Sequence, residues 1–383
     1  EIFYYWPIYY LFNGDESVYE TVRGISLTYL RRTENAFEHG YYPEPYFDTE
    51  HTLEGLITLA STAYLKPNDT QVIGPVEDLV EHCGNWVPGL PNWFNSNGQL
   101  LKSVNMGTQS VSTACPEGVD WPFNLGFAKL AMAAYHGTEN PRYLNWVKSY
   151  LDGWTNAMEL NEQQNGYYVM PAEVNPETGE AGPCSGKWYS AQFEPGWGWD
   201  QKGNNAMRDM RGAFFDYYRL TGDTNYVVPV RKHMQTLFDH KVGNTPALKF
   251  DGTQWLAGMD KTTTRTAVEL CYRDQNFDPD MYNTLETWGV KHYQPDYQMW
   301  RWRELGDEVS LMNLLNEAVK DAGNDLAALQ NLASLPAEPD DFPMIEDFRA
   351  ISLTAFGGIA PVRGEMPWTE VMYFKEDQSL GLE

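Results

Sequence analysis

The segment Tyr217-Tyr-Arg-Leu-Thr-Gly-Asp-Thr-Asn-Tyr226 decides the fold. It joins one apolar run with helical spacing to a second such run through a glycine–acid turn. Related segments are Leu11-Phe-Asn-Gly-Asp-Glu-Ser-Val-Tyr19, Tyr135-His-Gly-Thr-Glu-Asn-Pro-Arg-Tyr143 and Leu305-Gly-Asp-Glu-Val-Ser-Leu311, with a looser copy at Leu65-Lys-Pro-Asn-Asp-Thr-Gln-Val72. A turn that recurs between amphipathic helices predicts an array of helical hairpins.

Helical spacing of apolar residues continues outside these turns, as at Leu53, Leu56 and Leu59, whereas strand-like alternation is sparse. We expect hairpins at roughly 2–12 with 16–38, 51–65 with 70–84, 122–135 with 140–158, 205–220 with 225–240, and 295–305 with 308–322, plus a helix near 343–355. No change in composition separates two halves, so residues 1–383 are predicted to form a single domain. Arranged around one axis, about five to seven such hairpins form an all-α (α/α) toroid with an inner and an outer ring of helices.

Long connections rich in Gly, Pro, Trp and Asn separate the hairpins, at 39–50, 86–121, 160–204 and 243–294. Connections of this length in a compact domain usually carry function. Aromatic residues make up 14% of the chain, and many of its 14 Trp and 24 Tyr lie in these loops. Some of the rings are expected to pack in the core. Rings in loops suit a polysaccharide or oligosaccharide substrate, because they stack on the C–H face of a sugar.

Acidic residues outnumber basic ones, with 53 Asp and Glu against 27 Lys and Arg and a net charge of −26. This charge repels nucleic acid and anionic membranes, and no Lys or Arg run offsets it. No apolar stretch approaches the ~20 residues of a membrane-spanning helix. The chain begins with Glu rather than Met, from which we expect a removed leader and a secreted or periplasmic protein. We expect a monomer without a cofactor, although a structural divalent cation remains compatible with the sequence.

The four cysteines lie at positions 83, 115, 184 and 271, without any CxxC spacing, so a structural zinc site is not expected. Cys115 and Cys184 lie in loop-like sequence and could pair in an oxidising compartment. Cys83 and Cys271 lie in helix-like sequence and are expected to be buried thiols.

The turns, above all 217–226, resemble those of the (α/α)-toroid carbohydrate-active enzymes, which include toroid polysaccharide lyases and six-hairpin glycosidases. The resemblance covers about two thirds of the chain. Hairpins related by rotation place their Gly–acid turns on one rim, so the helices leading into those turns begin together on the opposite rim. We call this opposite rim, which the long loops also enter, the helix-start rim. The resemblance implies that the active site lies there.

Polar and aromatic side chains cluster at the expected helix starts, although Asp48 and Asp120 also fit N-caps and the tyrosines also fit core packing. Asn204, Arg208 and Arg211 stand at i, i+4 and i+7 and share one helix face. The candidate set comprises Asp48, His51, Glu54, Asp120, Trp121, Asn124, Asn204, Asn205, Arg208, Asp209, Arg211, Tyr293, Tyr297 and Arg301. A platform for stacking sugar rings is predicted within 160–204, from Trp188, Tyr189, Gln192, Trp197 and Trp199.

β-Elimination on a uronic-acid polysaccharide such as alginate or glucuronan is the reaction that this set favours. It requires a group that neutralises the carboxylate, a base for the C5 proton and an acid for the leaving oxygen. Tyr297 or Tyr293 is expected to serve as base and acid, because Arg301, one turn after Tyr297, favours the phenolate. The expected neutralising residues are His51, Asn124 and Arg208, and the expected substrate-binding residues include Trp121, Asn204, Asn205, Arg211 and Arg301. The chain lacks the Asn-Asn-His string of many toroid lyases.

Hydrolysis of a glycosidic bond is the alternative, and it requires two carboxyl groups. Asp120 precedes a Pro-Phe helix start, similar to the place of a catalytic Asp in unsaturated-uronyl hydrolases, although Val119 and Trp121 flank it instead of Met and Gly. The candidate second carboxyls are Glu54, Glu194, Asp200 and Asp209. A third hypothesis is a non-catalytic glycan-binding toroid.

Overall fold

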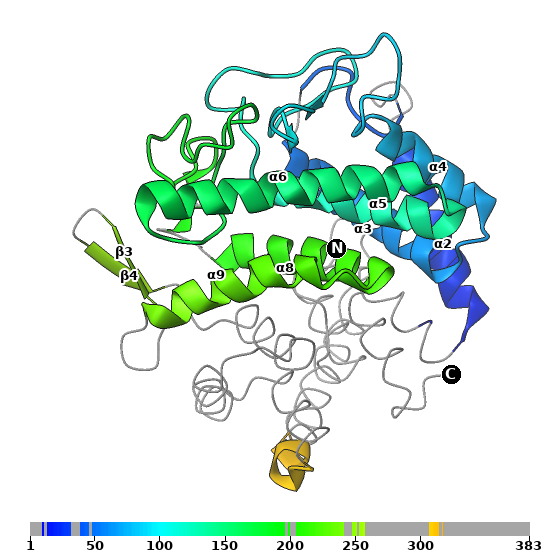
Figure 1. Cartoon of the computed structure of the whole chain (residues 1–383). Coiled ribbons are helices and arrows are strands. Elements are labelled where there is room, and N and C mark those ends of the chain that lie inside the picture. Colours follow the sequence, from blue (N-terminus) through cyan, green and yellow to red (C-terminus); the bar gives the residue numbers. More distant parts are fainter. Residues whose placement is uncertain are drawn as a thin grey trace, which may run out of the picture.

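The structure is a computed structural model of the chain. It describes residue 10 and residues 14–31, 39–45, 48–195, 198–199, 204–240, 247–250, 253–256, 306–313 and 316. This part of the chain is mainly α-helical, as Figure 1 shows. Among its helices, none combines the length and the apolar character that crossing a membrane requires.

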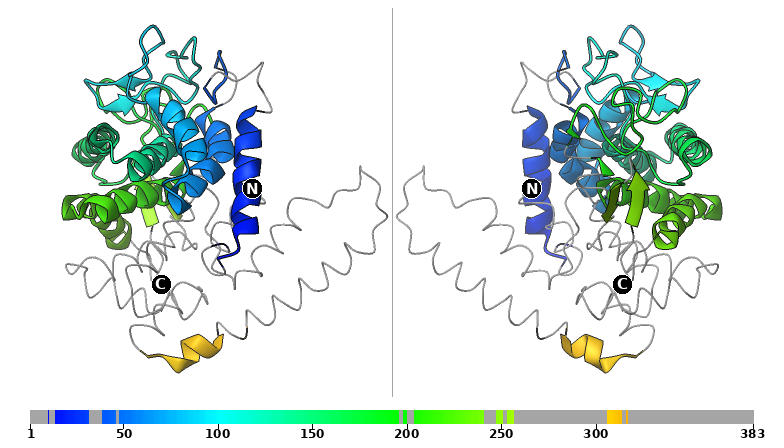
Figure 2. Two further views of the ribbon diagram at one scale, coloured as in Figure 1. Left: turned by 90° about the vertical axis from the view of Figure 1, so that its right-hand side faces the viewer. Right: turned by 90° about the vertical axis from the view of Figure 1, so that its left-hand side faces the viewer.

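The helices form antiparallel hairpins. α3 (Thr49–Leu65) pairs with α4 (Thr70–Glu81), α5 (Leu125–Thr138) with α6 (Pro141–Asn165), and α8 (Asn204–Thr221) with α9 (Val228–Asp239). α2 (Glu16–Arg31) lies at one edge of this array and the α8–α9 hairpin at the other (Figure 2). The hairpins predicted at 51–84, 122–158 and 205–240 are therefore confirmed. The helices predicted at 2–12 (apart from residue 10), 295–305 and 343–355 lie outside the described residues.

α3, α5 and α8 lie side by side, with α5 between the other two. Leu53 of α3 fills the space beside Gly126 of α5, where a Cβ atom would lie 2.7 Å from Leu53 Cδ1. On the other side, the Lys129 side chain of α5 fills the space beside Gly212 of α8. The residues of α5 at 125–134 are buried, apart from half-buried Gly126. Burial on nearly every side is expected of a helix in the inner ring of a toroid.

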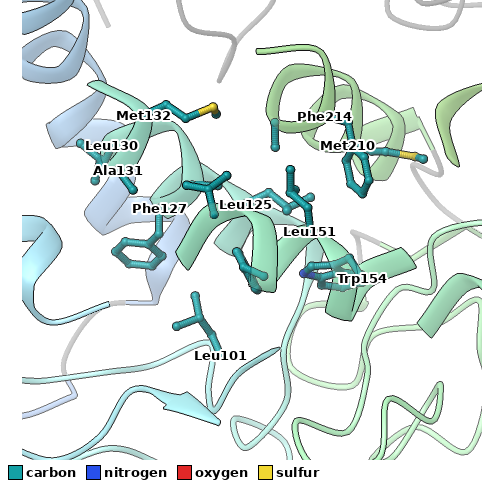
Figure 3. Packing of buried hydrophobic residues seen from close by; sticks show 14 of the residues in the cluster. Leu101, Leu125, Phe127, Leu130, Ala131, Met132, Leu151, Trp154, Met210 and Phe214 are labelled. Carbon is teal, nitrogen blue, oxygen red and sulfur yellow. The ribbon is translucent and has the colours of Figure 1, made fainter. Parts of the chain in front are cut away.

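One continuous hydrophobic core joins the hairpins. Figure 3 shows Phe127 of α5, Leu151 and Trp154 of α6 and Phe214 of α8 within it. Trp154 is fully buried, and burying a large apolar side chain contributes about 1.5–3 kcal/mol. Each hairpin therefore depends on its neighbours for much of its stability.

The turn after α8 shows why glycine and an acid recur together. Gly222 has a φ of 71°, in the left-handed region where a side chain is strained. The Asp223 carboxylate then accepts the backbone N–H of Asn225 (3.0 Å) and caps η3 (Thr224–Tyr226). The same pair occurs at Gly14 and Gly306, where Asp15 accepts the N–H of Ser17 and Asp307 that of Val309. The repeated motif is therefore a repeated helix stop and helix cap.

The copy at 135–143 reaches the same shape with different residues. Helix α5 continues through Gly137, and Glu139 is the residue with a left-handed φ, of 56°. Asn140 then caps α6 by accepting the N–H of Arg142 (3.2 Å). Gly137 serves packing instead, because a Cβ atom there would lie 2.2 Å from Ile73 Cδ1.

The described parts of the turns at 11–19, 65–72, 135–143 and 217–226 lie on one rim, and α3 and α5, which lead into two of them, start on the other, as predicted. The hydroxyl of Tyr19, near the start of α2, donates to Asp69 in the α3–α4 turn (3.0 Å). Tyr64, near the end of α3, stacks on His136, near the end of α5, with 4.2 Å between ring centroids. At the opposite ends of the same two helices, the Thr49 hydroxyl donates to Asn124. Figure 1 shows the α5–α6 and α8–α9 connections at the same end of their hairpins.

Short β-pairs and one disulfide order the long connections. β1 (Phe94–Asn95) pairs antiparallel with β2 (Leu100–Leu101), and Val174 pairs with both Asp120 and Ala181. A disulfide joins Cys115 to Cys184, with 5.5 Å between their Cα atoms. It links the α4–α5 connection to the α6–α8 connection and confirms the pairing suggested by loop position. Cys83 is free and buried, as expected, and Cys271 lies outside the described residues.

A β-hairpin follows α9, which the sequence did not predict. β3 (Ala247–Phe250) pairs antiparallel with β4 (Thr253–Leu256), with Ala247 opposite Leu256. Strands of this length contain too few residues for a clear alternating pattern.

Candidate functional site

The helix-start rim is formed by the first turns of α3, α5 and α8 and by three segments that lead into them. These rim segments are the described residues of 39–48, 100–124 and 182–199. The first lies along the second, because the N–H groups of Thr108 and Gln109 donate to the carbonyls of Tyr42 and Pro43 (3.0 and 2.7 Å). The disulfide joins the second to the third. η1 (Pro122–Asn124), just before α5, contacts α8. Residues far apart in the sequence thus meet at this rim.

A fully buried carboxyl group, that of Asp120, lies beneath the rim. Its Oδ1 accepts the Asn124 amide (2.8 Å) and the Tyr150 hydroxyl (3.1 Å), and its Oδ2 accepts the N–H of Leu101 (2.8 Å). Burial raises the pKa of Asp120 to about 7, although these hydrogen bonds oppose the rise by stabilising the carboxylate. Asp120 is not at an N-cap position, because Trp121 occupies that position of η1 and Asn124 that of α5. Asp120 instead pairs with Val174 through its backbone, while its side chain binds Leu101 of β2 and Tyr150 of helix α6.

Asn124 lies at the centre of the same hydrogen-bond network. Its amide group donates to the carbonyl of Ser103 (3.1 Å) and to Asp120, and its oxygen accepts the Thr49 hydroxyl and the Trp121 indole N–H (3.1 Å). These contacts use both donors and both acceptor positions of the side chain. Asn124 is also fully buried. Its contacts hold the starts of α3 and α5 together, and a catalytic role for it stays a prediction.

A small apolar cluster, separate from the main core, lies over this network. It contains the buried side chains of Val104, Val119 and Trp121, with the partly buried Phe123, Cys184 and Phe193 packed against them. The Trp121 ring lies 5.0 Å from that of Phe123 and 5.8 Å from that of Phe193, the latter edge-on at 89°. The Trp121 indole N–H also donates to Thr49 (2.8 Å). The cluster is thus anchored below by hydrogen bonds and covered by partly exposed phenyl rings.

Glu173 organises the third rim segment, and the sequence analysis missed it. Its carboxylate is fully buried and accepts the backbone N–H groups of Cys184 (3.1 Å), Ser185 (2.7 Å) and Gln192 (2.8 Å). These three contacts hold the segment between the disulfide and Gln192 in one conformation. The only sequence signal is an acidic residue in a loop, which does not by itself distinguish a buried anchor from a solvated charge.

The described rings of the predicted stacking platform are buried rather than exposed, and a role for them in sugar binding stays a prediction. Trp188, Tyr189 and Trp199 are 6%, 4% and 3% exposed and belong to the main core. The Trp199 indole N–H donates to the carbonyl of Met170 (2.7 Å), which satisfies its polar group inside the protein. Their rings therefore support the loop from within. Gln192, from the same prediction, is exposed.

Comparison with known proteins places the chain in a family. Residues 80–333 match the model of a domain of unknown function, DUF8034. The chain belongs to the DUF8034 family. No curated protein sequence matches it.

Among solved structures, the DUF8034 chain is similar to a D-mannose isomerase, with a TM-score of 0.53 and 12% identity over 76% of this chain and 73% of that chain. It is also similar to the GH76A α-1,6-mannanase from Salegentibacter sp. HEL1_6, with a TM-score of 0.45 and 13% identity over 94% and 89% of the two chains. At such identity the first similarity concerns the fold, and it agrees with an all-α toroid.

Several predicted site residues of the DUF8034 chain have no described side chain. The backbone places His51 and Glu54 in the first turns of α3, and Asn204, Asn205, Arg208, Asp209 and Arg211 in the first half of α8. Tyr293, Tyr297, Arg301, Trp197 and Asp200 lie outside the described residues. The roles predicted for all of these stay predictions. In the described part of the chain, no group of three His, Cys, Asp or Glu side chains is arranged to hold a metal ion.

Proposed function

We propose that this DUF8034 chain is a carbohydrate-active enzyme that binds a neutral saccharide at the helix-start rim and hydrolyses a glycosidic bond. The proposal is supported by the toroid fold shared with a sugar-processing enzyme, D-mannose isomerase, and by the aromatic cluster of Trp121, Phe123 and Phe193 at this rim. Aromatic rings beside polar groups suit the two kinds of surface on a pyranose.

The negative charge of the rim segments favours a neutral substrate over an anionic one. Apart from the buried Asp120, their described carboxyl side chains are those of Glu44, Asp48, Glu117 and Glu194, against the amines of Lys102 and Lys187. An excess of carboxylates repels a polyanion such as alginate. The same residue type is what hydrolysis requires, because a glycosidase uses one carboxyl as acid and another as base or nucleophile.

The pKa values of the described tyrosines also favour hydrolysis over elimination. A tyrosine that abstracts a proton in β-elimination needs a lowered pKa. Burial raises the pKa of Tyr150, beneath the rim, well above its ordinary value, and the Asp120 carboxyl beside it adds to the rise. Within the described part of the chain, every tyrosine with a resolved shift has a raised pKa. Tyr293 and Tyr297, the bases predicted for elimination, lie outside that part.

Glu194 and Asp48 are the carboxyls that we assign to direct contact with the saccharide. Glu194 is exposed, and Asp48 is half-buried at the start of α3. Asp120 has a pKa suited to a general acid, but its carboxyl is shielded from solvent and fully hydrogen-bonded within the protein. We assign to Asp120 a structural role, in which its hydrogen bonds hold the residues of the rim in place.

Incubation with neutral and anionic polysaccharides tests the proposal. The panel holds mannans, glucans, alginate and glucuronan, and the readouts are new reducing ends and the ultraviolet absorbance of an unsaturated uronate. Free mannose, followed by NMR, tests isomerisation. We expect reducing ends from a neutral polymer, without unsaturated product, and loss of turnover in Glu194→Gln and Asp48→Asn. Glu177→Gln, at an exposed position of the same α6–α8 connection, is the control and should keep full turnover.

Other outcomes overturn the proposal. Unsaturated product from a uronan would establish elimination, and conversion of mannose without chain cleavage would establish isomerisation. Glycan binding with no turnover of any substrate would indicate a binding module.

A further inference from the structure

We propose that Gln192, Phe193 and Glu194 form a saccharide-contacting tip in which the Phe193 ring stacks on one pyranose of the substrate. We call these three residues the loop tip. The inference rests on the proposed function only in placing a saccharide at the helix-start rim. It assigns the contact to a residue that the sequence analysis did not single out.

The loop tip combines an apolar ring with polar neighbours on both sides. Gln192 and Glu194 are exposed, whereas Phe193 is partly buried. The Phe193 ring meets Trp121 edge-to-face, at 5.8 Å and 89°. This contact supports one side of the phenyl ring and leaves part of it open to solvent. An open ring flanked by an amide and a carboxylate provides a stacking surface together with hydrogen-bonding groups for sugar hydroxyls.

The backbone of the loop tip is held in place before any ligand binds. The N–H of Gln192 donates to the buried Glu173 carboxylate (2.8 Å), which also holds Cys184 and Ser185. Cys184 is in turn bonded to Cys115 on the neighbouring rim segment. A binding surface that is already ordered loses little conformational entropy when ligand arrives. The buried anchor and the disulfide are therefore arranged as expected for a preformed contact surface.

The size and charge of the surface favour a sugar over a protein partner. The exposed apolar area of the loop tip amounts to one partly buried phenyl ring, far below what a stable protein interface buries. The adjacent Glu194 carboxylate disfavours anionic ligands, and its acceptor oxygens suit hydroxyl donors. A single pyranose ring matches both properties.

Substitution of Phe193 tests the inference. The wild type, Phe193→Ala, Phe193→Trp and a control variant are compared for KM and kcat on the neutral polymer that the wild type cleaves. Binding of the same polymer is measured separately by affinity electrophoresis. We expect Phe193→Ala to weaken binding and raise KM about tenfold, the equivalent of about 1.4 kcal/mol, with kcat nearly unchanged. Phe193→Trp keeps a stacking ring and should retain affinity.

Tyr64→Ala is the matched control, because it removes a partly exposed ring on the opposite rim, where Tyr64 stacks on His136. It should leave KM and polymer binding unchanged. Thermal unfolding of each variant separates loss of binding from loss of folding.

The outcomes distinguish this inference from the proposed function. Turnover by the wild type with an unchanged KM and unchanged binding in Phe193→Ala overturns the inference and leaves hydrolysis standing. Polymer binding by a wild type that shows no turnover, weakened by Phe193→Ala, supports the inference and overturns hydrolysis. A wild type that neither binds nor cleaves any glycan overturns both.

Discussion

The Tyr150 hydroxyl, on α6, donates a hydrogen bond of 3.1 Å to Asp120 Oδ1, just before α5. Both side chains are buried, and Tyr150 also stacks on Trp146 with 5.2 Å between ring centroids. An outer helix is thereby joined to the polar network that holds the inner helix starts together. The network is stabilising only while each buried group keeps its partner.

Asp120→Asn is expected to lower the free energy of unfolding by about 1–3 kcal/mol, because an amide N–H₂ would face groups that now donate to the carboxylate. Leu101 N–H or the Asn124 amide would lose its acceptor. Urea unfolding at about pH 8, where Asp120 is ionised, measures the change, with Glu177→Gln as a surface control. A change no larger than that of the control would show that the network does not depend on the carboxylate.

The pH dependence of stability gives a second test of Asp120. Its pKa is about 7 in the folded protein and near 3.8 in an unfolded chain. Between these values the folded state holds a proton that the unfolded state has released, so stability is expected to fall as pH rises from about 4 to about 7 and to level off above. The slope from this group approaches ~1.4 kcal/mol per pH unit.

The slope is isolated by subtracting the unfolding free energy of Asp120→Asn from that of the wild type across this pH range. This difference should decrease as the pH rises. A difference that is independent of pH would mean that the carboxyl does not titrate as its burial implies.

Sequence reasoning succeeded where the cause is local and failed where it is not. Gly222 and Asp223 predict a turn because a left-handed φ and a helix cap are properties of neighbouring residues. The surroundings of Asp120 were not predictable, since its partners Leu101 and Tyr150 lie 19 and 30 residues away. Trp199 likewise lies in sequence typical of an exposed sugar platform, whereas its contacts with the Met170 carbonyl and with the His233 ring of α9 belong to the core.

Glu173→Gln is expected to loosen the third rim segment without unfolding the protein. One carboxylate oxygen accepts the N–H groups of Cys184 and Ser185, and the other accepts that of Gln192. The N–H₂ group of glutamine replaces one of these oxygens and cannot accept a hydrogen bond, so the donors on that side lose their acceptor. We expect faster hydrogen exchange at these amides and faster limited proteolysis within 182–194, measured by mass spectrometry. Glu180→Gln, at an exposed residue in the same connection, should leave both rates at the wild-type level.

Removal of the disulfide is expected to destabilise the protein by up to about 4 kcal/mol, the loop-closure value for residues 69 positions apart. The double variant Cys115→Ser/Cys184→Ser should therefore have a lower Tm than the oxidised wild type. A reducing agent should lower the Tm of the wild type and leave that of the double variant unchanged. An equal Tm for the oxidised wild type and the double variant would show that the other contacts between the two connections suffice.

The glycines of two copies of the repeated turn are expected to resist substitution for different reasons. At Gly222 nothing lies within 4 Å of an added Cβ atom. Gly222→Ala should therefore lower the free energy of unfolding only by the ~1–2 kcal/mol that a left-handed φ costs a residue with a side chain, and Gly222→Asn should lower it less. At Gly137 an added Cβ atom would lie 2.2 Å from Ile73 Cδ1. Ile73→Val removes that atom and should partly rescue Gly137→Ala but not Gly222→Ala. Urea unfolding of the single and double variants gives the coupling energies, and equal coupling of Ile73→Val to both alanine variants would contradict the packing role of Gly137.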